Sequence, residues 1–258
     1  MKRTFAILMA ALLFLPACTK EIRTETLKLE EEIPLHEGSS NALSLSLDID
    51  FPVSGFSAQG LEAVRQAIRT YAISDNYADC NGPLSELGQI WRNTVAEDYL
   101  ETNQSMLEEM EISEEDAPFL NWGFDYKGCF GENYRHFVNY LIEKYEYLGG
   151  AHGMTAETPL VFDLKTGDIV QYEAFTEHVG AEKLEELIDK HKFDNLKEDI
   201  EVYGIEEENI FYVESIEPSS FYTVGEEGLT FYYQPYDVAP YVFGVITITI
   251  PWDELNAK

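Results

Sequence analysis

Residues 229–252, with the sequence LTFYYQPYDVAPYVFGVITITIPW, decide the fold class of this chain. The β-branched run at 242–250 is the strongest strand signal in the sequence, and Pro251 ends it because proline cannot donate to a strand ladder. Residues 229–234 predict a second strand, joined to the first by a loop with two prolines and two tyrosines. The stretch therefore predicts two connected strands that complete a sheet.

The chain before this stretch carries both strand and helix periodicities. Strict alternation of apolar and polar residues at 43–51 predicts a strand with one buried face. Aromatic, alternating segments at 119–126 and 134–147 predict a hairpin that turns at 131–133. The remaining predicted elements are a helix at 57–71 with Ser57 as its N-cap, a helix at 84–110, a hairpin of 154–162 and 168–172 around a turn at 163–167, a helix at 181–192 and a strand at 210–215.

Strands and helices come in separate runs rather than in strict βαβ alternation, which predicts the α+β class. We expect mixed, mainly antiparallel sheets packed with helices, in two closely associated subdomains. The predicted division is a signal peptide at 1–17, a tether at 18–40, and α+β domains at 41–145 and 146–258. We expect the charged tether to be extended or transiently helical and to space the domains from a membrane.

The first residues have the anatomy of a lipoprotein signal. Lys2 and Arg3 precede an apolar run at 5–15, which is shorter than the roughly 20 residues of a spanning helix. Residues 15–18 read Leu-Pro-Ala-Cys, so we expect cleavage before Cys18 and lipidation of that cysteine. The alternative is an ordinary secretory signal. Because Thr19 is not an aspartate, we expect a lipid-anchored envelope protein of the outer membrane, on its periplasmic or outward face.

The formal net charge of −31 restricts the possible partners. Such a field repels nucleic acid and anionic lipid and attracts cationic molecules, so we expect no nucleic-acid partner. The alternative interpretation is that the charge only keeps the protein soluble.

Two cysteines remain besides Cys18. In an oxidising compartment Cys80 and Cys129 form an isolated pair, which predicts a disulfide. The alternative is a pair of buried free thiols.

The segment 147–153, YLGGAHG, places one histidine among glycines. Glycines in such a run indicate backbone with positive φ or close approach. We predict that Tyr147, Gly149, Gly150 and His152 belong to a ligand-binding region, where His152 could also serve as a general base. The alternative is a histidine whose ring only bonds nearby backbone.

Tyr236 and Tyr241 complete the predicted ligand-binding residues. Proline stiffens their loop, so the rings are presented with little entropy to lose, which suits sugar or protein recognition. The alternative is a loop that packs over the sheet end. No metal-ligand spacing, Walker A, GxGxxG or GxSxG motif occurs, so we expect no cofactor, no metal and no assigned catalytic residue.

The motifs at 147–153, 162–168 (FDLKTGD) and 229–252 together resemble the DUF3298 family, and the segment from about 40 to 145 resembles its frequent companion DUF4163. The family occurs in bacterial envelope proteins. It is similar to the extracellular part of an anti-sigma factor that senses lysozyme and to the non-catalytic region of a peptidoglycan deacetylase. The resemblance implies a binding module for a lysozyme-like cationic protein or a peptidoglycan fragment, rather than an enzyme.

Two other functions stay open. The first is a hydrolase acting on peptidoglycan or a related glycan, or an accessory subunit of one, which would use His152 with a carboxylate. The second is a passive envelope scaffold. A histidine in an open cleft beside a carboxylate would favour hydrolysis.

Overall fold

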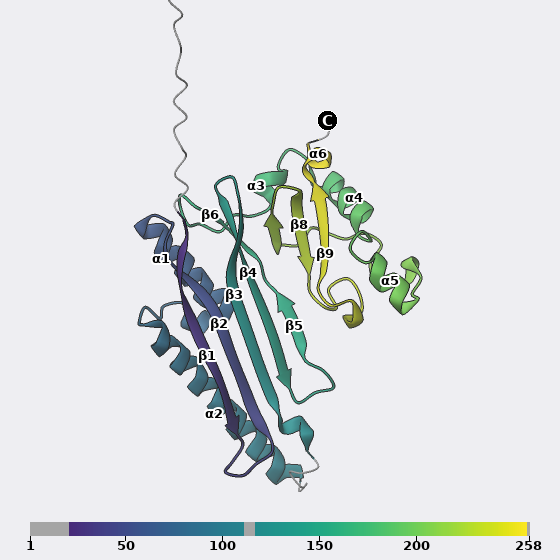
Figure 1. Ribbon diagram of the computed structural model, residues 1–258. Helices are drawn as coiled ribbons and strands as arrows, with labels where there is room; N and C mark the ends of the chain where they lie inside the picture. The colour runs from purple at the N-terminus through teal and green to yellow at the C-terminus, as the bar shows by residue number, and fades with distance from the viewer. Residues whose placement is uncertain (1–20, 111–116, 257–258) are drawn as a thin grey trace, which may run out of the picture.

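The computed structural model describes residues 21–110 and 117–256, which form two sheets lying side by side, each with its own helices (Figure 1). Each sheet contributes to a hydrophobic core of its own. The predicted α+β class, with mainly antiparallel sheets in two associated subdomains, is therefore confirmed. The predicted signal peptide at 1–17 and the predicted lipidation site Cys18 lie outside the described residues.

The first sheet contains six strands: β1 (Arg23–Pro34), β2 (Ala42–Ser54), β3 (Trp122–Tyr134), β4 (Phe137–Leu148), β5 (Met154–Glu157) and β6 (Leu160–Asp163). Their order is β1–β2–β3–β4–β5, and β6 pairs with a different stretch of β4 from β5. Only β2 and β3 pair in parallel, because the chain between them crosses over the sheet as helices. In its described part, this crossover contains α1 (Ala58–Ile68), a π-helical turn (Arg69–Ile73), 3-10 turns (Asp75–Tyr77, Pro118–Leu120) and α2 (Leu84–Met110).

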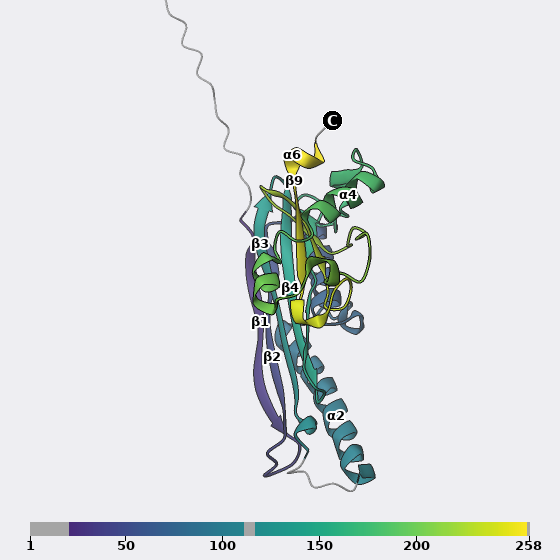
Figure 2. The same cartoon turned by 90° about the vertical axis from the view of Figure 1, so that its right-hand side faces the viewer.

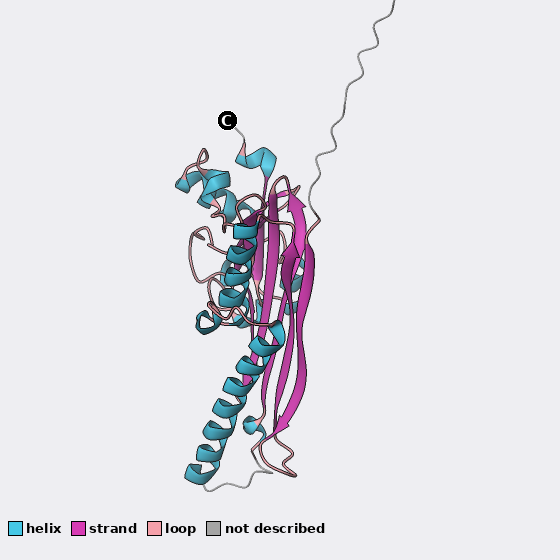
Figure 3. Cartoon of the chain, turned by 90° about the vertical axis from the view of Figure 1, so that its left-hand side faces the viewer, coloured by secondary structure: helices cyan, strands magenta, loops and turns pink. Residues whose placement is uncertain are grey.

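Both long helices cover the same face of the first sheet (Figures 2 and 3). The alternation predicted at 43–51 explains this packing, since every second residue of β2 is buried toward the helices. Trp91 of α2 contacts Phe124 and Tyr126 of β3 at ring-centroid distances of 6.3 and 5.6 Å. As predicted, the Ser57 side chain caps α1, accepting a hydrogen bond from the Gly60 amide at 3.0 Å.

The second sheet is antiparallel, in the order β7–β8–β9. Its strands are β7 (Tyr222–Val224), β8 (Gly228–Tyr233) and β9 (Ile246–Pro251), and its helical segments are α3 (Glu173–Thr176), α4 (Ala181–His191), α5 (Lys197–Tyr203), α6 (Trp252–Leu255) and the 3-10 turns Glu207–Asn209 and Tyr241–Phe243. The predicted helix at 181–192 is confirmed as α4, with Leu184, Leu187 and Ile188 buried in the second core. None of the helices in the described ranges is both long and apolar enough to cross a bilayer.

Two side-chain amides join the sheets, because each forms hydrogen bonds with the backbone N–H and C=O of one residue, as a neighbouring strand would. Asn139 of β4 accepts a hydrogen bond from the Val224 amide at 3.0 Å and donates one to the Val224 carbonyl at 2.8 Å. Gln234, directly after β8, accepts from the Glu157 amide at 2.9 Å and donates to the Glu157 carbonyl at 2.7 Å. Each amide therefore satisfies both backbone groups of one residue on the other sheet.

The predicted tether is wrong over most of its length. Residues Arg23–Pro34 form β1, which pairs with β2 along its whole length and places Leu27 in the first core. The division predicted between residues 145 and 146 falls inside β4, and the first sheet continues to Asp163 at the end of β6. The two subdomains therefore meet near residue 163.

Three turn and strand predictions need correction. The β3–β4 hairpin is confirmed, but it turns at Arg135, which has a φ of 56°, and His136, while the predicted turn at 131–133 is an irregularity in the ladder. The predicted strand at 210–215 is irregular chain, and β9 begins only at Ile246 because Gly244 adopts a φ of 62°. The 163–167 turn is confirmed, with Gly167 at a φ of 81°.

The predicted disulfide is also wrong, because Cys80 and Cys129 are free thiols. Cys80 packs against the first core on the helix-covered face. Tyr126 of β3 packs in the first core, on the helix-covered face. Cys129 is exposed and is three residues further along the strand, so its side chain lies on the opposite face of the sheet. The sheet itself therefore separates the two sulfur atoms.

Candidate functional site

The structure brings together three of the predicted ligand-binding residues in one aromatic stack. The His152 ring lies on the Tyr241 ring, with centroids 4.0 Å apart and planes 23° apart. Tyr241 in turn stacks on Tyr236, at 5.7 Å and 29°. The stack joins the β4–β5 connection to the loop between β8 and β9, so both subdomains contribute to it.

A single carbonyl oxygen fixes the stack at its inner end. The carbonyl of Gly153, a buried residue, accepts hydrogen bonds from the Tyr241 hydroxyl at 2.7 Å and from His152 Nδ1 at 3.0 Å. Because Nδ1 donates to a carbonyl, the neutral His152 ring keeps its lone pair on Nε2. No carboxylate in the described residues forms an ion pair with His152, and no group of three or more possible metal ligands occurs there.

Tyr236 is held in a backbone conformation that favours glycine. Its φ is 73°, and the Asp237 amide donates to the Gln234 carbonyl at 3.0 Å across a turn with Pro235 at the second position. Asp237 Oδ2 also accepts from the Gln234 amide at 2.8 Å. Tyr236 is 51% exposed. An exposed aromatic residue at a positive φ makes this loop a candidate for a functional surface.

The other predicted site residues, Tyr147, Gly149 and Gly150, lie in the β3–β4 ladder or in the turn after β4, outside the stack. Gly149 has a φ of 80°, and a Cβ atom there would lie 1.7 Å from the Phe119 carbonyl oxygen. Gly150 is exposed and has open space around it. Tyr147 pairs with Gly123 in the ladder of β3 and β4, and no ring contact joins it to the stack among the described residues. Gly149 therefore shapes the turn after β4, and of the predicted residues only His152, Tyr241 and Tyr236 meet in the stack.

Two glutamates face each other beside the Gln234 contact. Glu157 of β5 is opposite Glu143 of β4 in the ladder. Partial burial, and next to it the charge of Glu143, raise the pKa of the Glu157 carboxyl above its usual range. The charged form of Glu157 is therefore less stable in the folded protein than in the unfolded chain.

The Glu157→Gln substitution is expected to stabilise the protein at neutral pH. A raised pKa in the folded state gives stability that is present below the unfolded pKa of about 4.3 and is lost as the pH rises through the folded value. The variant should therefore melt on the order of 1–2 °C above wild type at pH 7 and level with it near pH 4. Thermal melts at both pH values test this. Glu30→Gln, a charge removal on exposed β1, controls for net charge; an equal gain from Glu30→Gln would contradict the local explanation.

Two structural features near the stack carry no sequence motif. Gln234 is one, since its partner Glu157 is 77 residues away. A surface pocket next to the stack loop is another, lined by the acidic run Glu206–Glu208 and by Phe211 and Tyr212. The only sign of this pocket in the sequence is the segment 206–212, EEENIFY, in which an acidic run precedes two aromatic residues.

The fold and the stack define an α+β protein with a cluster of stacked aromatic rings where two subdomains meet. Residues 163–253 match the model of a family described as "Protein of unknown function (DUF3298)", which confirms the resemblance for this segment. A crystal structure of a DUF3298 family member from Bacteroides fragilis NCTC 9343 has a TM-score of 0.79 and 19% identity, over 93% of this chain and 94% of that chain. A DUF3298 family protein from Pseudomonas aeruginosa PAO1 gives 0.55 and 15%, over 92% and 94%. A search of curated proteins finds no match.

Proposed function

We propose that this chain is a lipid-anchored protein of the bacterial cell envelope that binds a cationic, lysozyme-like protein at the stack of His152, Tyr241 and Tyr236. The observation that carries the proposal is the exposed ring of Tyr236 on a backbone with a φ of 73°. Such a rigid aromatic residue gives contact area with little loss of entropy on binding. The net charge of −31 would speed the approach of a basic partner.

In this proposal Cys18 carries the lipid and the segment 41–145 is the DUF4163-like part. Because β1 begins at Arg23, the chain after Cys18 can reach at most about 18 Å before the first strand. The folded body would then lie close to the membrane surface instead of at the end of a long tether.

The test measures binding of the purified protein to a lysozyme at roughly 20 mM and 500 mM salt, because screening at high salt should weaken a charge-driven complex. The key variant is Tyr236→Gly, which removes the ring and accepts the positive φ, so that its unfolding free energy should stay within about 1 kcal/mol of wild type. We expect its affinity to fall about tenfold or more.

Tyr71→Ala is the matched control, because Tyr71 is also exposed (41%) but lies in the π-helical turn that follows α1. No detectable binding at low salt would contradict the proposal, as would equal losses from the two variants. Salt-independent binding of a peptidoglycan fragment, with none of lysozyme, would show that the stack recognises a glycan.

A further inference from the structure

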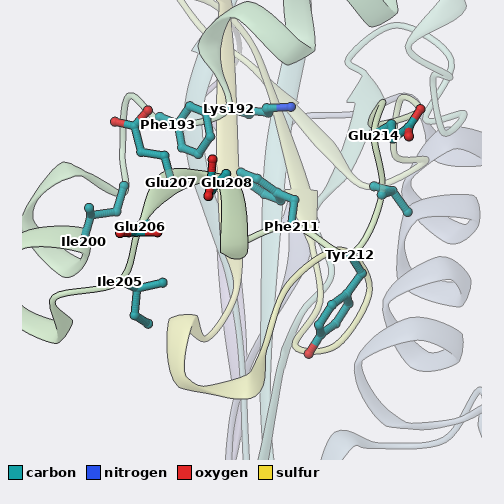
Figure 4. A pocket seen from close by; sticks show the side chains of 11 residues that line it. Lys192, Phe193, Ile200, Ile205, Glu206, Glu207, Glu208, Phe211, Tyr212 and Glu214 are labelled. Atoms are coloured by element: carbon teal, nitrogen blue, oxygen red, sulfur yellow. The ribbon is translucent and has the colours of Figure 1, made fainter.

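A second binding feature lies in the DUF3298 segment, beside the stack loop. It is a surface pocket of about 1010 Å³ between the end of α4, the helix α5 and the chain that follows α5. The floor of the pocket is formed by four apolar residues that pack against the second core: Phe193, Ile200, Ile205 and Phe211, whose side chains Figure 4 labels. A pocket of this volume is large enough to hold a ligand or a short peptide segment.

The rim of the pocket is strongly acidic. Glu206, Glu207 and Glu208 lie on one side of the Phe211 ring and Glu214 lies on the other (Figure 4). All four glutamates are exposed. Carboxylates on both sides of an apolar floor select for an occupant with several positive charges spaced along an apolar body.

Lys192 is the one basic residue that lines the pocket, and it is already neutralised. Its Nζ lies 3.4 Å from Asp189 Oδ1 and stands 5.7 and 5.4 Å from the ring centroids of Phe193 and Phe211. The two rings thus already accommodate an ammonium group over their faces. The four rim glutamates have no such internal counter-charge among the lining residues.

The pocket is continuous with the stack loop. The amide of Tyr212, which lines the pocket and is 60% exposed, donates to the Val238 carbonyl at 2.9 Å. Tyr203 at the end of α5 contacts the Phe243 ring at 6.0 Å. Because Val238 and Phe243 belong to the connection between β8 and β9, a ligand on the stack can extend into the pocket.

We propose that this pocket receives a short basic peptide segment, with an apolar side chain on Phe193 and Phe211 and flanking lysines or arginines facing the glutamates. A small amine would meet only one side of the rim, whereas a peptide can place cations on both sides. The inference rests on the proposed function and deepens it, since the segment would belong to the cationic partner.

The test uses a synthetic peptide of alternating lysine and leucine, with the purified protein and isothermal titration calorimetry. We expect measurable binding, and we expect a glutamine–leucine peptide and an all-lysine peptide to bind at least tenfold more weakly. The pocket variant replaces Glu206, Glu207 and Glu208 by glutamine, and its affinity for the lysine–leucine peptide should fall at least tenfold. The matched control removes three charges from exposed positions of α2: Glu97→Gln, Asp98→Asn and Glu101→Gln.

The control triple variant should change the affinity less than threefold. Equal losses of affinity in the two triple variants would contradict binding in the pocket, because the peptide would then respond only to the net charge of the protein. A second variant, Val213→Lys, adds a cation at an exposed rim position and should also weaken the peptide. If lysozyme binds the pocket variant as tightly as wild type, the pocket does not take part in binding the partner, while the proposed binding at the stack is unaffected. If lysozyme does not bind at all, the proposed function falls.

Discussion

The Asn139→Leu variant should lose about 2–5 kcal/mol of unfolding free energy. Asn139 is only 9% exposed, and its amide pairs with both backbone groups of Val224, which is fully buried. Its Nδ2 also donates to the Glu132 carbonyl at 3.1 Å. Leucine has similar volume but no polar atoms, so the Val224 amide and carbonyl would each lose a hydrogen-bond partner in a buried contact.

Urea unfolding followed by circular dichroism measures the loss. The matched control is Asn103→Leu in α2, because Asn103 is also fully buried but neither polar atom of its amide has a hydrogen-bond partner in the described part of the chain. Burying an unpaired amide costs about 1–3 kcal/mol, so leucine at this position should stabilise the protein by roughly 1 kcal/mol. Effects of the same sign in both variants would show that the Val224 contact does not explain the loss.

The strand β1 shows where sequence periodicity fails. Leu27, Leu29 and Ile33 alternate with polar residues, but Glu31 occupies the inward position between them. Glu31 is tolerated there because Arg92 of α2 binds it with two hydrogen bonds, at 2.6 and 3.0 Å. A contact between residues 61 positions apart leaves no local signal, and the acidic run therefore predicted a tether.

The binding region divides in a similar way. The glycines around His152 and the prolines around Tyr236 and Tyr241 are local signals of constrained backbone, and they predicted the residues that form the stack. Asn139 and Gln234 have no such signal, because each acts on a backbone group 77 or more residues away. Residue chemistry thus predicts which groups can bind, while the strand pairing decides which groups meet.

The Gly149→Ala variant should lose about 2–4 kcal/mol of unfolding free energy. The φ of 80° alone costs an alanine about 1–2 kcal/mol, and the added Cβ would lie 1.7 Å from the Phe119 carbonyl oxygen, so the backbone after β4 must also move. Urea unfolding measures the loss.

Gly150→Ala is the control, because a Cβ atom at the next residue would meet nothing closer than the His152 carbonyl oxygen at 3.9 Å. A loss below about 1 kcal/mol in this variant would show that the strain belongs to one residue of the run. Equal losses would mean that the whole run needs glycine. Since Gly149 directs the chain toward His152, we expect Gly149→Ala to weaken lysozyme binding as well, and Gly150→Ala to leave it within twofold. The glycine then supports binding through the backbone that positions the histidine, without contacting the ligand itself.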